Sequence, residues 1–260
     1  MRIAVVAPSN TVSPRVPELV APLVAARGID LVFHPQCFAS SGHFAGSDKD
    51  REDALVEVAN DPAVDVVWCA RGGYGANRIA GSAIARMGDA ARAKTFIGYS
   101  DAGFLLAGLF AAGIGRPVHG PMPSDVLRAG GDAAVARTLD WLLTPSMPAQ
   151  PQFAFNLTVL SHLLGTPLQP DFGGRVLMLE EVDEPMYRVD RALFHVTANA
   201  DVRRCAGLMF GRCAPITPNV PDFCEDEESV ARRWCANAGI AWLGRADIGH
   251  DAANKVVPFA

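Results

Sequence analysis

The sequence predicts an α/β protein whose first part holds a mostly parallel sheet with flanking helices. Short apolar runs alternate with helix-length segments as far as residue 143, which is the pattern of repeated βα units. Residues 64–70 are almost continuously apolar, as in parallel strands covered on both faces. Half of the 260 residues are hydrophobic, which is enough for a substantial core.

The elements of this first part can be placed in order. We expect strands at residues 2–7, 30–34, 64–70, 95–97 and 117–119. We expect helices at residues 19–26, 50–60, 77–87, 102–112 and 133–143. Pro8 breaks the first strand, and Gly28 ends the first helix.

Residues 144–152 contain three prolines and no regular pattern, which indicates a linker. We therefore predict an N-terminal domain over residues 1–143 and a C-terminal domain over residues 153–260. In the second domain we expect helices at residues 157–164, 187–195 and 227–238, and strands at residues 175–182 and 207–210. Residues 248–259 read as a Gly-His turn followed by a short strand.

Composition narrows the function classes. The net charge is −5 with acids and bases interspersed, so we expect neither nucleic acid nor an anionic membrane as a partner. The apolar stretch before Pro8 is too short for a secretory signal, and no run approaches a membrane span. We expect a cytoplasmic protein. The six cysteines form no C-x-x-C, and their spacing argues against a zinc site, so we expect free thiols and no metal.

Residues 95–106, TFIGYSDAGFLL, join a short apolar strand to an apolar helix through Ser100. A serine at a sharp strand-to-helix turn projects from the sheet, and backbone N–H groups there can face an oxyanion. Gly98 permits the tight turn. The motif departs from G-x-S-x-G, because Ala102 stands at the second glycine position. The alternative is that Ser100 or Asp101 caps the helix.

A glycine-rich turn, Arg71-Gly72-Gly73-Tyr74-Gly75, follows the apolar run at residues 64–70. Open α/β sheets bind ligands at the carboxyl ends of such strands. The G-x-G-x-x-G and P-loop spacings are absent, so we expect no nucleotide cofactor here.

A serine nucleophile needs a histidine base that a carboxylate orients. His250 lies in a turn with little apolar content, and His119 ends a strand at the ligand edge of the sheet. Glu180 and Glu181 end an otherwise apolar strand and face opposite sides of it, so only one can serve. The alternative for these glutamates is a salt bridge to Arg188 or Arg191.

Several stretches together resemble the LD-carboxypeptidase family of serine peptidases, which includes murein tetrapeptide carboxypeptidases and microcin C self-immunity peptidases. They run in the family's order from residue 4 to residue 259. The matching stretches are AVVAPS, GHFAGSDKDR, CARGGYGANRI, FIGYSDAGFLL, VHGP, NLTVLSHLLGTP, VLMLEEVDEPMYRVDRAL and IGHDAANKVVPF. The combination of RGGYG with a downstream GYSD, LEE and GH is the specific part. The resemblance implies a smaller C-terminal domain rich in β structure.

The resemblance also implies residue roles. Ser100 matches the nucleophile, Glu180 the triad carboxylate and His250 the general base. The backbone N–H groups of Gly73 and Asp101 would hold the oxyanion.

Two departures bear on the substrate. Ala102-Gly103 replaces the family's Ile-Thr after Ser-Asp, and the chain stops at Ala260, where members continue for another strand. We therefore expect trimmed substrate-binding loops or a trimmed dimer edge. We add Arg71, Tyr74 and His119 as substrate-binding candidates.

Together these features predict a cytoplasmic serine LD-carboxypeptidase. It would release a terminal D-amino acid from an L,D-linked muropeptide during peptidoglycan recycling, without metal or cofactor. Two alternatives stay open: hydrolysis of a peptidyl- or aminoacyl-nucleotide antibiotic, and an inactive binding protein of the same fold. The oligomeric state is also open, with a homodimer as one option.

Overall fold

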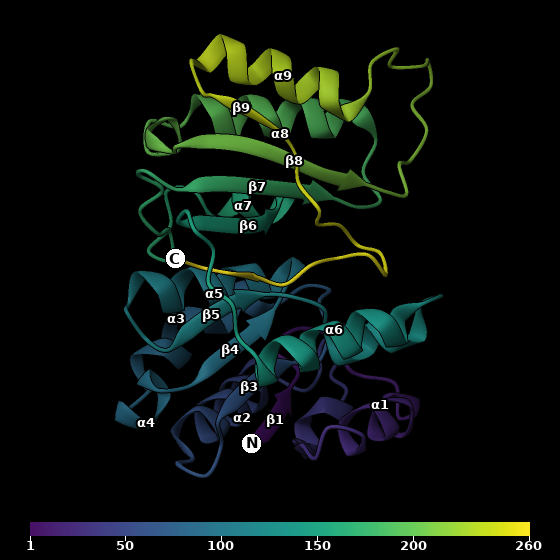
Figure 1. The fold of residues 1–260 in the computed structure, drawn as a ribbon, viewed down its shortest axis with the longest axis vertical. Helices are drawn as coiled ribbons and strands as arrows, with labels where there is room; N and C mark the ends of the chain where they lie inside the picture. Colours follow the sequence, from purple (N-terminus) through teal and green to yellow (C-terminus); the bar gives the residue numbers. More distant parts are fainter.

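The computed structural model describes residues 1–260 as two stacked α/β layers, each built on its own sheet (Figure 1). The first sheet has six strands in the order β10-β5-β4-β3-β1-β2. Its strands are β1 (Arg2–Val6), β2 (Asp30–Phe33), β3 (Val66–Cys69), β4 (Thr95–Gly98), β5 (Arg116–His119) and β10 (Val257–Pro258). All pairs are parallel except β10 with β5. The predicted parallel α/β sheet is therefore confirmed.

Helices cover both faces of this sheet. Its helices are α1 (Arg15–Ala25), α2 (Asp48–Asn60), α3 (Ala76–Ala85), α4 (Asp89–Arg92), α5 (Gly103–Ala111) and α6 (Gly131–Leu143). Neighbouring β3 residues point to opposite faces: Val67 packs in the larger core cluster with α2, α3 and α5, and Trp68 packs with α1 and α6. This two-sided burial explains the continuous apolar run of β3.

The second sheet has four parallel strands in the order β6-β7-β8-β9. They are β6 (Gln152–Asn156), β7 (Val176–Glu181), β8 (Gly207–Cys213) and β9 (Trp242–Arg245), and the helices are α7 (Leu157–Leu163), α8 (Met186–Ala198) and α9 (Glu227–Ala238). The sequence predicted neither β6 nor β9. The first helix was expected to begin at residue 19, but α1 begins at Arg15, because the first turn of a helix tolerates a proline such as Pro17.

The remaining regular segments are short 3-10 turns at Pro35–Phe38, Ser100–Ala102, Pro123–Leu127 and Val202–Arg204. No helix is long and apolar enough to cross a bilayer. None of the six cysteines forms a disulfide.

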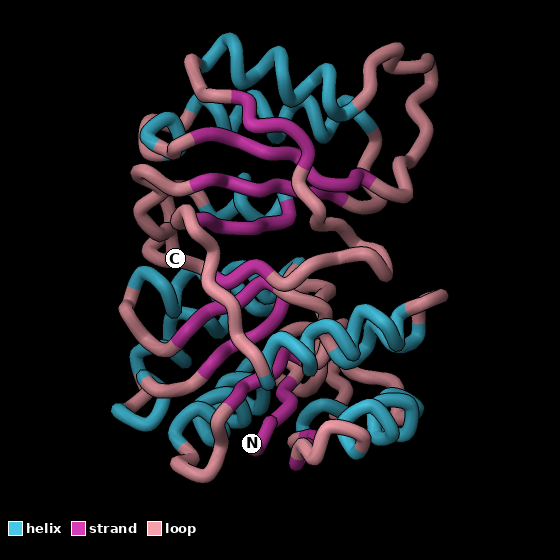
Figure 2. Tube along the Cα trace, in the orientation of Figure 1, coloured by secondary structure: helices cyan, strands magenta, loops and turns pink.

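The C-terminal tail connects the two layers. After β9 the chain leaves the second sheet, passes between the layers and pairs as β10 with β5 (yellow in Figure 1, and mostly loop in Figure 2). Val257 pairs with His119, and Ala260 N donates to Gln152 O at 3.2 Å. Residues of this tail, including His250, therefore lie between the two layers.

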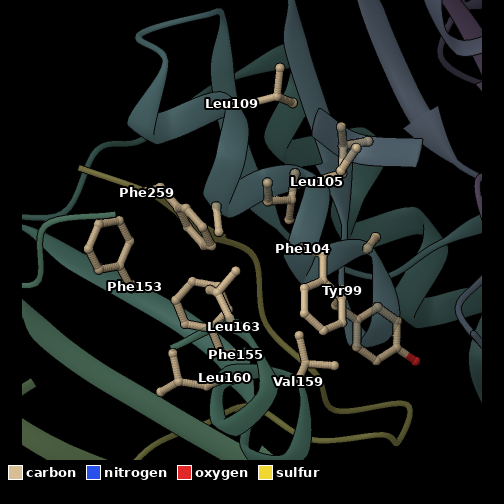
Figure 3. Packing of buried hydrophobic residues seen from close by; sticks show 14 of the residues in the cluster. Tyr99, Phe104, Leu105, Leu109, Phe153, Phe155, Val159, Leu160, Leu163 and Phe259 are labelled. Carbon is tan, nitrogen blue, oxygen red and sulfur yellow. The ribbon is translucent and has the colours of Figure 1, made fainter. Parts of the chain in front are cut away.

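Aromatic packing fixes the layers against each other. The Phe259 ring lies 5.0 Å from that of Phe153 and 5.2 Å from that of Phe155, and α5 and α7 close the cluster with Phe104 and Leu160 (Figure 3). Phe259 is 5% exposed. Truncating a phenylalanine buried in this way costs about 3–5 kcal/mol. The tail that carries His250 is thus anchored at its end.

Candidate active site

Ser100 occupies a strained turn between β4 and α5. Its φ is 59°, in the left-handed region that non-glycine residues avoid. A Cβ at Gly98 would lie 2.8 Å from that of Ala102, so this turn requires glycine there. Neither Ser100 nor Asp101 caps α5, whose N-cap is Ala102 without a side-chain bond. The helix-capping interpretation was therefore wrong.

The Asp101 side chain instead ties the serine turn to two neighbouring segments. It accepts a hydrogen bond from Ser9 Oγ at 2.5 Å and one from Ala76 N at 2.8 Å. The residue is 3% exposed, and burial raises the pKa of its carboxyl. Ser9 follows β1 and Ala76 begins α3, so one carboxylate holds together three loops at the carboxyl edge of the sheet.

The glycine-rich turn lies directly against the serine. A Cβ at Gly72 would approach Ser100 Oγ to 2.9 Å and Asp101 N to 3.6 Å. Gly73 has a φ of 119°, and a side chain there would overlap Asn10. Buried Arg51 donates to Gly75 O at 2.9 Å and to Pro8 O, which holds the turn from below.

His250 and Glu180 form a buried pair. His250 Nδ1 lies 2.6 Å from Glu180 Oε2, and the two side chains are 6% and 0% exposed. Burial lowers the pKa of His250, but the charge and hydrogen bond of Glu180 outweigh it and leave the pKa above its ordinary value of 6.5. The second ring nitrogen, Nε2, is buried without a hydrogen-bond partner. It is therefore free to accept a proton.

The surroundings of His250 fix its position. Its ring lies 4.9 Å from that of Tyr99, and Arg128 donates to its backbone carbonyl. Two residues before it, Ile248 O accepts from Arg212 N at 2.9 Å. Gly211 allows this approach, because a Cβ there would lie 2.5 Å from Ile248 O.

Glu181 points away from His250 and has a different set of contacts. Its two oxygens accept from Asn156 Nδ2 at 2.6 Å, from Thr158 N and Oγ1 at 2.9 and 2.6 Å, and from Val182 N at 3.0 Å. Burial raises the pKa of its carboxyl. The alternative of a salt bridge from this glutamate pair to Arg188 or Arg191 does not hold, because Glu180 pairs with His250 and Arg188 pairs with Glu184.

His119 lies behind the site and not at its surface. It is 1% exposed, its Nε2 contacts Asn254 Oδ1 at 3.2 Å, and its ring lies 5.5 Å from Tyr99. Burial lowers its pKa to about 4, so it stays neutral near pH 7. Contrary to the substrate-binding prediction, His119 lines neither cleft beside Ser100, because β10 and the tail cover it.

Two clefts meet at Ser100. The first has a volume of about 460 Å³ and includes His250, Tyr99, Arg71 and Arg128 in its lining. The second has a volume of about 520 Å³ and is lined by Tyr74, Asn77, Asn156, Thr158, His162 and Glu184 among others. Ser100, Gly73 and Val182 line both clefts.

Sequence reasoning missed a group of residues around the first cleft. Asp125 accepts from Tyr99 Oη at 2.7 Å and from Met122 N at 2.7 Å, and it pairs with Arg128 Nε at 3.2 Å. The only sequence signal was their position, shortly after β5 in the loop at the ligand edge. Their relation to Ser100 depends on the fold.

The comparison with known sequences agrees with this architecture. Residues 3–120 match the family model described as the LD-carboxypeptidase N-terminal domain, and residues 153–260 match the C-terminal domain model. A putative carboxypeptidase of Streptomyces coelicolor is 35% identical, over 84% of this chain and 76% of its own. The murein tetrapeptide carboxypeptidase of Pseudomonas aeruginosa is 24% identical, over 99% of this chain and 91% of its own.

Solved structures share the fold. A muramoyltetrapeptide carboxypeptidase from Oxalobacter formigenes has a TM-score of 0.86 at 24% identity, covering 99% of this chain and 92% of that one. The microcin C7 self-immunity protein MccF has a TM-score of 0.83 at 17% identity, covering 100% of this chain and 91% of that one. With two matched family models spanning most of its length, this chain belongs to the LD-carboxypeptidase family of peptidases.

Proposed function

We propose that the protein is a serine-type LD-carboxypeptidase with Ser100, His250 and Glu180 as its triad. One observation carries the proposal. Ser100 lines the same cleft as His250, whose Nδ1 is engaged by the buried Glu180 carboxylate at 2.6 Å. A nucleophile, a base and an orienting carboxylate are the parts that acyl transfer needs.

The pair sets the tautomer of the base. Because Nδ1 donates to Glu180, the neutral ring presents Nε2 as an acceptor, and that atom has no other partner. Nε2 takes the proton of Ser100 as Oγ attacks the amide carbonyl. No hydrogen bond joins Ser100 to His250 in the structure, and catalytic hydrogen bonds often tighten only in the substrate complex.

The tetrahedral oxyanion would be held by the backbone N–H groups of Gly73 and Asp101. The closeness of Gly72 to both Ser100 Oγ and Asp101 N supports this assignment, because it brings the glycine-rich turn beside the serine. Such a donor contributes about 10²–10³ in turnover. Protonated His250 then gives its proton to the leaving amine, and water releases the acyl-enzyme.

The substrate proposed is a muropeptide with a terminal D-residue linked to an L-centre. This rests on the relative from Pseudomonas aeruginosa, which is named for murein tetrapeptide. An aminoacyl-nucleotide antibiotic would call for an aromatic surface for its base, and none of the four tryptophans lines either cleft. Of the tyrosines and phenylalanines there, Tyr99 and Phe104 are buried, which leaves only Tyr74 exposed.

Incubation with a murein tetrapeptide that ends in L-lysyl-D-alanine tests the proposal. Mass spectrometry should detect free D-alanine and the tripeptide, and the matched peptide ending in L-alanine should be cut far more slowly. Release of neither residue, with intact protein, would contradict a carboxypeptidase function. If the protein cleaves an aminoacyl sulfamoyl nucleoside but not the tetrapeptide, the antibiotic-immunity function would replace the one proposed.

A further inference from the structure

The position of His250 determines in which direction the peptide lies across Ser100. The base that takes the serine proton later donates it to the leaving amine, so the leaving residue must lie on its side of Ser100. His250 lines the first cleft and not the second. The leaving residue therefore occupies the first cleft, and the acyl part of the peptide runs into the second.

A leaving residue at a chain end carries a free carboxylate close to its amine. The first cleft offers two arginines to such a group, Arg71 and Arg128. Arg71 has no carboxylate partner, and its one hydrogen bond runs from NH1 to Thr11 O at 3.2 Å. Its other donors are uncommitted and are available to a ligand in the cleft.

The same cleft holds one more unused donor besides those of Arg71. Ser124 Oγ is buried and has no hydrogen-bond partner. Buried hydroxyls are normally satisfied by hydrogen bonds, so this one points to a polar ligand. Ser124 lies next to Asp125, whose carboxylate is already occupied by Tyr99, Met122 N and Arg128.

Arg128 also contacts the histidine of the proposed triad. Its Nε pairs with Asp125 at 3.2 Å, and NH1 donates to the backbone carbonyl of His250. Its side chain is 41% exposed, so the rest of the guanidinium faces the cleft. A carboxylate bound by Arg128 would therefore be connected to the base, His250, through the Arg128 side chain.

The two acidic residues that line the cleft repel a bound anion only weakly. Asp125 is neutralised by Arg128, and Asp183 is exposed to solvent, which screens its charge. The lining thus presents one cation without a carboxylate partner, Arg71, together with the exposed part of Arg128 and a free hydroxyl, around the place where the leaving residue ends.

We propose that Arg71, Arg128 and Ser124 bind the terminal carboxylate of the leaving residue and so restrict the enzyme to chain ends. This inference rests on the proposed function, because it places the leaving residue by the role of His250. Arg71 supplies the main contact, since of the two arginines it alone has no carboxylate partner. Arg128 links the bound carboxylate to the backbone of His250.

The test compares two substrates that differ only at the chain end: N-acetyl-L-lysyl-D-alanine and its C-terminal amide. Wild type should prefer the acid. In Arg71→Gln, kcat/KM for the acid should fall about 10- to 100-fold, mostly through KM, because a charged hydrogen-bond partner is lost. For the amide it should change by less than about threefold. Arg71→Lys should restore only part of the preference, since lysine lacks the fork of donors.

Arg78→Gln is the matched control. Arg78 lies on α3 near the glycine-rich turn, but it pairs with Asp48 at 2.7 Å and lines neither cleft. It should leave the acid-to-amide preference intact. A preference that is unchanged in Arg71→Gln and in a folded Arg128→Gln would overturn the carboxylate site while leaving the triad standing. If wild type cuts neither substrate, the proposed function fails and the inference fails with it.

A binding measurement keeps the test independent of turnover. In the Ser100→Ala background, D-alanine should bind more tightly than D-alaninamide by isothermal titration calorimetry. Adding Arg71→Gln should abolish that difference, and adding Ser124→Ala should reduce it. Equal affinities for the two ligands in the Ser100→Ala protein would count against the site directly.

Discussion

His250 Nδ1 lies 2.6 Å from Glu180 Oε2, although 70 residues separate them in the chain. Glu180 lies in β7 of the second sheet, while His250 lies on the tail that returns to β5 of the first. The pair therefore exists only when the tail is anchored between the layers. Because the contact occupies Nδ1, it decides which ring nitrogen faces the cleft.

The first prediction concerns the pH profile of Glu180→Gln. In wild type the pKa of His250 lies above 6.5, so kcat/KM should fall as the pH drops through that raised value and the base becomes protonated. Without the Glu180 charge, the buried imidazole loses its stabilisation as a cation. The acidic limb should then move to lower pH, and the plateau should fall by about 10³–10⁴, as in other triads. An acidic limb that stays in place would contradict the pairing.

Glu181→Gln is the matched second prediction. Glu181 accepts four hydrogen bonds, so an amide NH₂ would face two donors whichever way it is turned. We expect about 1–3 kcal/mol lower stability in urea unfolding, with turnover per folded molecule close to wild type. Loss of turnover in a fully folded Glu181→Gln, with Glu180→Gln unharmed, would reverse the assignment.

The third prediction concerns strain at Ser100. With φ at 59°, serine pays a conformational cost that glycine does not. Ser100→Gly should therefore be about 1 kcal/mol more stable than Ser100→Ala, which keeps the Cβ and the strain. Both should be inactive. Chemical denaturation of the two variants measures the difference, and equal stabilities would show that the turn is unstrained.

The fourth prediction compares alanine substitutions at two glycines, Gly72 and Gly81. Gly72→Ala places a Cβ 2.9 Å from Ser100 Oγ, so the glycine-rich turn or the serine must shift. A displacement of this size should lower kcat by about 10²-fold. Gly81→Ala, in α3 with open space around it, should keep full activity and gain about 0.5–1 kcal/mol. Unchanged kcat in Gly72→Ala would argue against an oxyanion site at this turn.

Much of the fold could be predicted from sequence, and the failures have physical causes. β3 and β4 stood out because both faces are buried, which makes the runs continuously apolar. β6 was missed because it begins at Gln152, directly after the proline-rich stretch, although Phe153, Ala154 and Phe155 are buried. β9 is a half-exposed edge strand containing glycine, so it carries little pattern.

The site, too, could be predicted only in part. The turns around Ser100 and Gly73 are local, and their glycines mark them in the sequence. Other parts of the site depend on contacts between loops that are distant in the sequence, so the sequence could not show them. They are the hydrogen-bonded Asp125 carboxylate, the Arg71 side chain without a carboxylate partner and the buried Ser124 hydroxyl. His119 shows the opposite error, because its place at a strand end predicted a surface role and the tail buries it.

The most direct test of the account is the rate of D-alanine release from L-lysyl-D-alanine peptides by wild type and by Ser100→Ala. Both proteins should be folded to the same extent by circular dichroism, since a small turn residue contributes little to packing. Ser100→Ala should lose at least about 10³-fold in turnover, because the nucleophile itself is removed. A folded Ser100→Ala that keeps more than about a tenth of wild-type turnover would contradict the central claim that Ser100 is the nucleophile.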